Sequence, residues 1–530
     1  MLHKTSFPIS VLQYLFVISE VLFHPLVWSL NHFVAPFILS TYEHQWHFNI
    51  IVKRVLYAPS VLLFLAVFAI PALFGGLLRC LLHLVRRPYV LSINKSFIPP
   101  SITERRSSLS LGRITGNLNN KRNSLTLVTK EKTFTICSAN ICLLPELLAR
   151  INNLPNPAAR SFEIGKRIAI DQFFFQNSMN AILSGPTRQR KSSDTSKTDK
   201  EKPTRQRKSS GTSKTDKGKQ KIEPSHNILT HFPKLDFLCL QETWDRDHSH
   251  KLMSELHKVF PWILYDVGKT RLSTNRFMFN SGLMFCSKYE ILDANFLPFN
   301  DKVAQCIYLA KGLLMIKVLL SSTELHDNVG YIFTSHLQAY QGSETAIQKQ
   351  LDEILKWTTE FREETNKSTD KIMFDMLCGD FNFDNISPVD EACTQHELFD
   401  VYEDVCRVRA GKDHDWTVGT EVRQMCLWEK QVSTPEGLKE ALLDPVLRHR
   451  YMIDANIKEG TMDELCNTKP LCEESVRANI LDVAGRRRID YVLYRKDNPV
   501  NVQNYSFITR LATQTDHIPI SMTFTCESQQ

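Results

Sequence analysis

Polar residues that could bind a cation or move a proton follow several apolar runs of the chain. The run "IMFDMLCGD" ends at Asp380, and Asn382 comes two positions later. Residues two apart on an extended backbone point the same way, so a carboxylate and a carboxamide here could share a hard cation or a phosphoryl oxygen. Taken alone, the pair Gly379 and Asp380 favours an ordinary turn that ends a strand, because both are common turn residues.

The same arrangement recurs at the other candidate strand ends. These carry Asn140 after "FTICSA", Glu242 after "LDFLCLQ", His336 after "GYIFTS", Asp490 in "RRRIDY", and Asp516 with His517 in "ATQTDH". Together the residues supply carboxylates and amides for a hard cation and two histidines for proton transfer. Metal-assisted hydrolysis of a phosphate ester requires such a set, because it needs a cation, a base for water and a donor to the charged transition state.

Short apolar strands with few helices between them must position these residues. The candidate strands are "KTFTICSANIC", "LDFLCLQE", "SGLMFCSK", "GLLMIKVLL", "NVGYIFTSHL", "IMFDMLCGD", "IDYVLY" and "ISMTFT", and helical periodicity occurs in "HKLMSELHKVF" and "AIQKQLDEILKWTTEFREE". This pattern predicts one α+β domain over residues 131–526, with two packed sheets flanked by helices. A tandem duplication of "PTRQRKSS" at 186–219 interrupts it, and its lack of apolar residues predicts disorder.

The N-terminal part, residues 1–90, is strongly apolar. Residues 55–78 contain no charged side chain, and 24 residues in a helix are enough to cross a bilayer's hydrocarbon layer. Residues 10–40 are nearly as apolar but are interrupted by Glu20 and two prolines, so they fit an interfacial or re-entrant helix at least as well. A buried helical hairpin of a soluble protein is the alternative.

Basic residues follow the second apolar segment. Arg79, Arg86 and Arg87 place the rest of the chain on the cytosolic side by the positive-inside tendency, and residues 91–130 read as a basic linker. The net charge of +7 is concentrated in the first half of the chain, which predicts contact with anionic phospholipids through these basic segments.

Cysteine and histidine spacings predict no structural zinc site. The 13 cysteines form no CxxC pairs, and several lie inside apolar runs, as expected in a reducing, cytosol-facing environment. His248 and His250 have the spacing of a metal pair but lie at a charged helix start, so we do not expect them to bind metal. Cys80, next to the apolar segment, is a possible palmitoylation site.

The ordered motifs resemble a known superfamily. "SAN", "LDFLCLQET", "GDFNFDN", "RRRIDYVLY" and "TDHIPI" resemble the endonuclease/exonuclease/phosphatase (DNase I-like) superfamily, whose fold is a four-layered α/β sandwich. "NICLLPELLARINN", "FPWILYDVG", "NSGLMFCSKY" and the hydrophobic N-terminus, as a helical membrane anchor, resemble the membrane-associated, magnesium-dependent neutral sphingomyelinases. The resemblance covers nearly the whole chain apart from the basic duplication.

The resemblance implies a role for each strand-end residue. Glu242 would be the main Mg²⁺ ligand with Asn140 beside it, and Mn²⁺ could substitute for the magnesium. Asp380 and Asn382 would orient the attacking water and bind the phosphate. His517 would be the general base, oriented by Asp490. Asp516 would order the metal-side network, and His336 would bind phosphoryl oxygens or protonate the leaving alkoxide.

One position departs from the sphingomyelinase pattern. Related enzymes have an aspartate five residues before the lysine that corresponds to Lys311, and this pair is implicated in switching the site on. Here Cys306 takes the place of the aspartate. A regulatory role for Lys311 is therefore open, whereas the chemistry is unaffected.

The expected function is Mg²⁺-dependent hydrolysis of sphingomyelin to ceramide and phosphocholine at a membrane surface. The alternatives are another superfamily phosphodiesterase, namely a lysophospholipase C-type enzyme, an inositol phosphatase or a nuclease, and a catalytically dead membrane scaffold. An inositol phosphatase would usually carry a "WCDR" element, which is missing. No nucleic-acid partner is expected, because a membrane-tethered chain is badly placed to find DNA.

Overall fold

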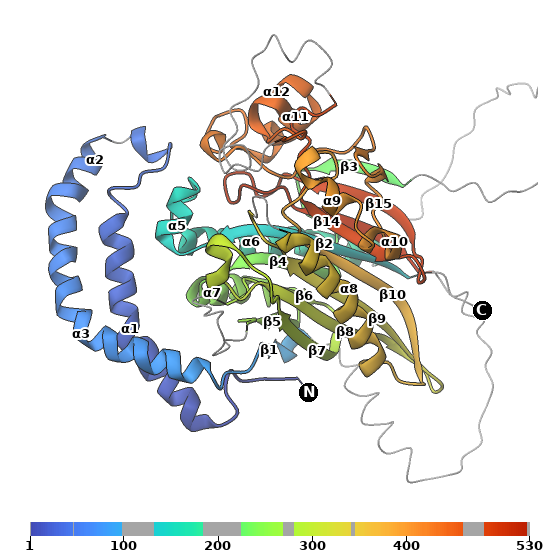
Figure 1. The fold of residues 1–530 in the computed structure, drawn as a ribbon, viewed down its shortest axis with the longest axis horizontal. Coiled ribbons are helices and arrows are strands. Elements are labelled where there is room, and N and C mark those ends of the chain that lie inside the picture. The colour runs from blue at the N-terminus through green and yellow to red at the C-terminus, as the bar shows by residue number, and fades with distance from the viewer. Residues whose placement is uncertain are drawn as a thin grey trace, which may run out of the picture.

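The structure, a computed structural model, is described here for residues 2–45, 47–97, 132–183, 224–268, 280–340, 345–458 and 482–526. Within these ranges the catalytic part is built on two large sheets (Figure 1). The eight-stranded sheet has the order β1-β5-β6-β4-β2-β16-β15-β3, and the six-stranded sheet has the order β11-β14-β10-β9-β8-β7.

The strands have the following bounds. In the eight-stranded sheet they are β1 Val90–Ile93, β2 Thr133–Leu143, β3 Ser225–Leu229, β4 Phe237–Thr243, β5 Trp262–Tyr265, β6 Met284–Ser287, β15 Asn501–Ile508 and β16 Ile520–Thr525. In the six-stranded sheet they are β7 Glu290–Pro298, β8 Gly312–Ser322, β9 Asp327–His336, β10 Asp370–Asp380, β11 Tyr402–Glu403 and β14 Asp490–Arg495, and a small hairpin joins β12 Arg407–Arg409 to β13 Lys412–Asp413.

The helices lie outside the sheets or before them in the chain. They are α1 Ser10–Val34, α2 His47–Val52, α3 Ala58–His83, α5 Glu146–Ile151, α6 Pro157–Leu183, α7 Arg246–Leu256, α8 Ala346–Thr365, α9 Glu391–Thr394, α10 Leu398–Val401, α11 Pro435–Leu443 and α12 Pro445–Tyr451. A π-helical turn, η2 Lys53–Tyr57, joins α2 to α3, and a 3-10 turn, η4 Ala304–Tyr308, precedes β8.

Both sheets are buried on both faces, which explains why their strands are apolar runs. In β4, Cys239 faces the core between the sheets, whereas the next residue, Leu240, faces helices α6 and α7. In β10, Cys378 faces the same central core and Leu377 packs under α8. This alternation with a period of two gives four layers, helix, sheet, sheet and helix, and it confirms the predicted α+β sandwich.

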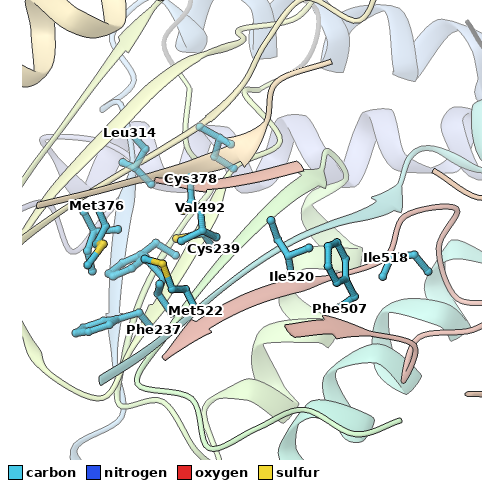
Figure 2. Packing of buried hydrophobic residues seen from close by; sticks show 14 of the residues in the cluster. Phe237, Cys239, Leu314, Met376, Cys378, Val492, Phe507, Ile518, Ile520 and Met522 are labelled. Atoms are coloured by element: carbon cyan, nitrogen blue, oxygen red, sulfur yellow. The ribbon is translucent and has the colours of Figure 1, made fainter. Parts of the chain in front are cut away.

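The central core is built from inward-facing side chains of both sheets (Figure 2). Cys239 and Met522 from the eight-stranded sheet meet Met376, Cys378 and Val492 from the six-stranded sheet. Because these side chains are fully buried, the two sheets are held at a fixed distance, and the ends of β2 and β4 lie over those of β9, β10 and β14.

The two predicted apolar segments form the helices of a hairpin. Helix α1 and the continuous helix from Ile50 to His83 are each long and apolar enough to cross a membrane, judged by length and composition. They pack against each other beside the sandwich (Figure 1). Most of their apolar residues are exposed, which differs from the alternative of a buried core hairpin.

Two segments differ from the expected domain plan. Strand β1, at the start of the region read as a linker, pairs with β5 from Val90↔Tyr265 to Ile93↔Trp262, so the sandwich takes its edge strand from residues before 131. Helix α6, with 27 residues, was not among the predicted helices. The tandem duplication at 186–219 lies outside the described residues, as does most of the predicted linker.

Candidate active site

The register of the six-stranded sheet brings three of the predicted residues to one edge. In β10, Asp380 is the parallel partner of His336 in β9 and the antiparallel partner of Asp490 in β14. Strand β9 ends at His336, β10 ends at Asp380, and β14 begins at Asp490. The three side chains therefore lie in a row where the sheet meets its loops.

The facing sheet contributes Asn140 from β2 and Glu242 from β4. Nδ2 of Asn140 donates to Oδ2 of Asp380 at 2.9 Å, which joins the two sheets across the site. Oδ1 of Asn140 accepts from the Cys142 amide at 3.1 Å, so its carbonyl oxygen is already engaged. Glu242 has a left-handed backbone with φ of 62°, strain of a kind that collects at functional sites.

His517 and Asp490 form the closest histidine–carboxylate pair of the site. Nδ1 of His517 lies 2.9 Å from Oδ2 of Asp490, and its Nε2 lies 3.9 Å from Oδ2 of Asp380. Burial by itself lowers the pKa of His517, but Asp490, Asp380 and Asp516 outweigh it and raise that pKa well above its ordinary value. A carboxylate at Nδ1 fixes the tautomer in which Nε2 can accept a proton.

Glu242 and Asp516 provide an unbalanced negative charge. Burial, together with the nearby Asp516 carboxylate, raises the pKa of Glu242 to about 7. Asp516 receives one hydrogen bond, from Nε2 of Gln424 at 2.9 Å, and its buried Oδ1 has no hydrogen-bond partner among the described residues. Buried carboxylates without enough cationic partners fit a hard cation, which would satisfy these oxygens and relieve their repulsion.

A second carboxylate group also lies within reach of a cation. Ligand atoms of Asp380, Asp490 and His517 all lie within 4.8 Å of one another. In this group, however, the His517–Asp490 hydrogen bond already uses one oxygen and one ring nitrogen. Nδ1 of His517 is therefore occupied by Asp490, whereas Oδ1 of Asp490 has no hydrogen-bond partner among the described residues. The metal-ligand role of Glu242 and the base role of His517 stay predictions.

One ring nitrogen of His336 is hydrogen-bonded to a lysine and is therefore not free to bind a substrate. Nζ of Lys311 lies 2.8 Å from Nε2 of His336 and also donates to the carbonyl of Leu337 at 2.6 Å. Burial, with Lys311 and His517 nearby, lowers the pKa of His336 well below its ordinary value. A neutral ring that accepts from Lys311 at Nε2 carries its proton on Nδ1, so Nε2 of His336 has no proton to donate while this contact exists.

Asn382 is held by a network that the motifs did not reveal. Its amide donates to Oδ1 of Asp380 at 3.0 Å, and its Nδ2 donates to the Leu337 carbonyl at 3.1 Å. Below it, the buried Arg487 donates from Nε to Glu421 at 2.8 Å and from Nη1 to Asp384 at 2.9 Å. Arg487 lies in the quoted "RRRIDY" motif, so the signal was present, but nothing in its spacing identified its partners.

The remaining candidates are placed as follows. His248 and His250 both lie on α7, which runs from Arg246 to Leu256. The Asp245 side chain caps α7 by accepting from the His248 amide. Cys80 is exposed on α3, and its lipidation stays a prediction.

Comparison with known proteins shows which enzymes this chain is similar to. No protein-family model matches the chain. Sphingomyelin phosphodiesterase 5 of Danio rerio is 28% identical, with 98% of this chain and 97% of that protein covered. Sphingomyelin phosphodiesterase 3 of Rattus norvegicus is 26% identical, with 98% of each covered, and the Homo sapiens protein of that name is 35% identical over 56% of this chain and 46% of that protein. The chain is related to the sphingomyelin phosphodiesterases.

This relationship confirms the resemblance read from the motifs and the predicted enzyme class, a phosphoric diester hydrolase. Among solved structures, beta toxin from Staphylococcus aureus with bound magnesium ions has a TM-score of 0.39 and 13% identity, covering 74% of this chain and all of that chain. SmcL has a TM-score of 0.36 and 13% identity, covering 74% and 99%. Since these scores are low, the sandwich is assigned from the layers of the chain itself.

The structure shows where Cys306 lies, the residue that takes the place of the aspartate of related enzymes. Cys306 is fully buried on η4. Lys311 has no carboxylate among its hydrogen-bond partners in the described part of the chain and is held instead by His336 and Leu337. A regulatory role of Lys311 therefore stays a prediction, and any such role would act through His336.

Proposed function

We propose that the chain is a Mg²⁺-dependent sphingomyelin phosphodiesterase, which hydrolyses sphingomyelin to ceramide and phosphocholine at a membrane surface. The observation that carries the proposal is the His517–Asp490 pair, whose free Nε2 faces Asp380 at the edge where Glu242 and Asp516 collect negative charge. The names of the full-length relatives supply the substrate class.

Glu242 would hold the magnesium, and Asp516 would lie beside it with its unpartnered oxygen. Bound Mg²⁺ would neutralise phosphoryl oxygens and make the phosphorus more electrophilic. Asn140 would lie beside Glu242 at the metal, since its Oδ1 accepts one hydrogen bond, from the Cys142 amide, and has a second lone pair. Its Nδ2 would hold Asp380 in place through the 2.9 Å hydrogen bond.

The protein groups divide the proton transfers between them. A water positioned by Asp380 and Asn382 gives one proton to Nε2 of His517 while its oxygen forms a bond to phosphorus. The bond between phosphorus and the ceramide oxygen would break on the opposite side, and the leaving alkoxide would take up a proton from solvent water. The imidazolium of His517 would return its proton to solvent at the end of the turnover, so that one water is consumed for each sphingomyelin. Asp490 stabilises the imidazolium that forms, which is the role its 2.9 Å hydrogen bond to Nδ1 allows.

The hairpin would keep the enzyme at its lipid substrate. Exposed apolar side chains cover both helices, and Arg86, just after α3, forms a buried ion pair with Asp266 of the sandwich at 2.5 Å. This contact keeps the end of α3 on the same side as the catalytic domain. We propose a cytosol-facing catalytic domain and contact of the basic segments with anionic phospholipids.

A substrate panel tests the proposal. The purified full chain would be assayed in mixed micelles with sphingomyelin, lysophosphatidylcholine or phosphoinositide, and in solution with DNA, each with Mg²⁺ and with chelator. We expect phosphocholine from sphingomyelin only when Mg²⁺ is present. Faster cleavage of another substrate would contradict the substrate, and unchanged activity in chelator would contradict the metal.

The ligand assignment has its own test in Mg²⁺ binding measured by calorimetry. Glu242→Gln should weaken binding by about 100-fold, since a carboxylate ligand is replaced by a neutral amide. Glu324→Gln, a change of the same type at an exposed position, serves as the control. Equal affinities for both variants would contradict the assignment of Glu242.

A further inference from the structure

A large cavity lies between the hairpin and the sandwich, apart from the strand-end residues. Its volume is about 1070 Å³, above the ~300–1000 Å³ of usual small-molecule sites. The hairpin supplies one wall, and the starts of α5, α6 and α7 supply the other. Figure 1 shows α5 and α7 as the catalytic elements on the side that faces the hairpin.

The hairpin wall combines apolar and polar side chains, and its polar members are His24, Asn31, His32, Lys53 and Ser60. Val27, Ala35, Pro36 and Leu56 line it together with the aromatic residue Trp28, and Tyr57 lies at the start of α3. The Trp28 ring stacks on His32 with 4.1 Å between centroids. The apolar side chains of this wall suit an acyl chain.

The cavity is lined by equal numbers of acidic and basic side chains. It is lined by three carboxylates, Glu146, Asp245 and Asp247, and by three cationic side chains, Lys53, Arg150 and Lys251. Burial lowers the pKa of both His248 and His250, so these two rings add no charge near neutral pH. Arg150 is already paired with Glu146 at 2.7 Å and with Glu43 at 2.6 Å, so the cationic groups left to meet a phosphate are Lys53 and Lys251. Asp245 and Asp247 are the carboxylates that a quaternary ammonium group would meet, so a zwitterionic headgroup fits both kinds of charge.

The cavity is continuous with the elements of the candidate active site. Asp245, in its wall, comes three residues after Glu242 and caps α7. Helix α6 begins in the same wall, and its Arg160 donates to the carbonyls of Cys142 at 2.7 Å and Gln514 at 2.6 Å, which lie next to the strand ends that hold Asn140 and Asp516. A molecule in the cavity therefore lies behind the metal-side edge of the site.

We propose that this cavity binds one choline phospholipid from the membrane, with an acyl chain against the hairpin wall and the zwitterionic headgroup against α5 and α7. The proposal rests on the proposed function in that the hairpin lies in a membrane that contains choline lipids. The bound lipid lies between the hairpin and the elements that carry Asp245 and the start of α6.

Photolabelling tests the proposal without turnover. The full chain would be placed in vesicles that contain phosphatidylcholine with a photoreactive acyl chain, and the labelled peptides would be mapped. Phosphatidylcholine is not sphingomyelin, so labelling does not depend on catalysis, and a failure here is distinct from a failure of sphingomyelin hydrolysis. We expect labels on residues 24–36 and 52–60, on the side lined by the cavity.

A matched pair of variants separates the cavity from the membrane-facing surface. Ala158 lines the cavity and Ala159, its neighbour, is exposed and does not. Ala158→Trp should fill the cavity and reduce labelling about tenfold, whereas Ala159→Trp should leave it unchanged. Circular dichroism of both variants checks that the fold is retained.

Three results would overturn the proposal. One is labelling confined to the outward residues 62–74 of α3, which indicates general bilayer contact. Another is equal labelling of the two variants. The third is stronger labelling by photoreactive phosphatidylserine than by phosphatidylcholine, which would show an anionic lipid as the occupant.

Discussion

The Asp380 carboxylate contacts or lies near four other residues of the candidate site. Its Oδ2 accepts from Asn140 and lies 3.5 Å from Nε2 of His336 and 3.9 Å from Nε2 of His517. Its Oδ1 accepts from the Asn382 amide. One carboxylate therefore links both sheets and both histidines, so its position decides how the predicted base and the predicted water-binding residues face each other.

The pairing of His517 with Asp490 predicts the effect of Asp490→Asn. The amide keeps the size of the side chain but removes the charge that orients and stabilises the imidazolium. We expect kcat for sphingomyelin to fall by about 10²–10⁴ with little change in KM. Steady-state kinetics in mixed micelles measure this, with the exposed Asp352→Asn as control. Equal kcat values for the two variants would contradict the orienting role.

At this scale the sequence revealed the residues but not their contacts. Asp380 was recognised because it directly follows an apolar run, and a run of that kind is a buried strand. His517 was recognised through the motif "TDHIPI", and it lies in the loop before β16 rather than at the end of an apolar strand. The Lys311–His336 contact was not foreseen, because the two residues are 25 positions apart and meet only through the loops at one end of the sheet. Similarly, the engaged carbonyl oxygen of Asn140 depends on the bend at Cys142, where φ is 46°.

Among the elements, strand β10 positions the site because it lies between β9 and β14. Its close approach to β9 requires a glycine at 379, where φ is 149° and an added Cβ would lie 2.0 Å from the Ser335 carbonyl oxygen. The β9–β10 pairing therefore fixes Asp380 relative to His336 only as long as this position has no side chain.

Gly379→Ala should destabilise the fold by about 3 kcal/mol, because both the backbone conformation and the clash oppose it. Thermal unfolding of the detergent-solubilised chain measures the loss. Gly411→Ala is the matched control, since its φ is 77° but nothing lies within 4 Å of the added Cβ, and it should cost about 1 kcal/mol. If both variants unfolded at the same temperature, the close approach would not be the cause.

Asp375, also in β10, predicts a pH-dependent stability. It is fully buried between Arg362 at 3.1 Å and the Tyr402 hydroxyl at 3.0 Å, and burial raises its pKa to about 6. Between about pH 4 and pH 6 the folded chain keeps a proton that the unfolded chain loses. Stability from this group is therefore present below pH 4 and is lost as the pH rises to 6, by about 3 kcal/mol.

The measurement is urea unfolding of wild type and Asp375→Asn from pH 4 to pH 7. The variant cannot titrate at this position, so its stability relative to wild type should increase across that window. Parallel pH profiles for the two proteins would show that Asp375 keeps an ordinary pKa in the folded chain.

The elements could be predicted from sequence where one segment carries a complete pattern. Strand β10 is a nearly continuous apolar run and helix α8 shows a clear period of 3.6 residues, and both lie where expected. Helix α6 was not predicted. It ends at Leu183, directly before the polar duplication that begins at residue 186, so this stretch was assigned to the region around the duplication and not examined for helical periodicity. Strand β1 was missed because its partner β5 lies about 170 residues later, and pairing over such a distance leaves no local signal.

At the scale of the whole molecule, polar contacts attach the hairpin to the sandwich at both of its ends. Near the end of α3, Arg86 pairs with Asp266, and the nearby arginines outweigh burial to lower the pKa of Asp266 to about 2. Near the turn of the hairpin, Arg150 donates to Glu43 at 2.6 Å and Asn153 accepts from the Thr41 amide at 2.8 Å. These contacts orient the apolar helices relative to the candidate site.

The exposed apolar side chains of α3 predict how the chain is retained on membranes. Leu63 and Val67 are 71% and 64% exposed, so replacing both with glutamate adds charge without removing core contacts. The double variant should float with lipid vesicles much less than wild type, because each charge in the hydrocarbon layer costs about 3 kcal/mol. Vesicle flotation measures this, and Leu325→Glu, 85% exposed on the β8–β9 hairpin, should float normally. Equal flotation of all three proteins would contradict membrane contact by α3.

The central claim is that water, activated by His517, attacks the phosphorus of sphingomyelin. The most direct measurement is hydrolysis in ¹⁸O-labelled water, followed by mass spectrometry of both products, for wild type and His517→Ala. The account predicts that the label enters phosphocholine and not ceramide, and that His517→Ala reduces product formation by at least about 10³-fold. Label in ceramide, or full activity of His517→Ala, would contradict it.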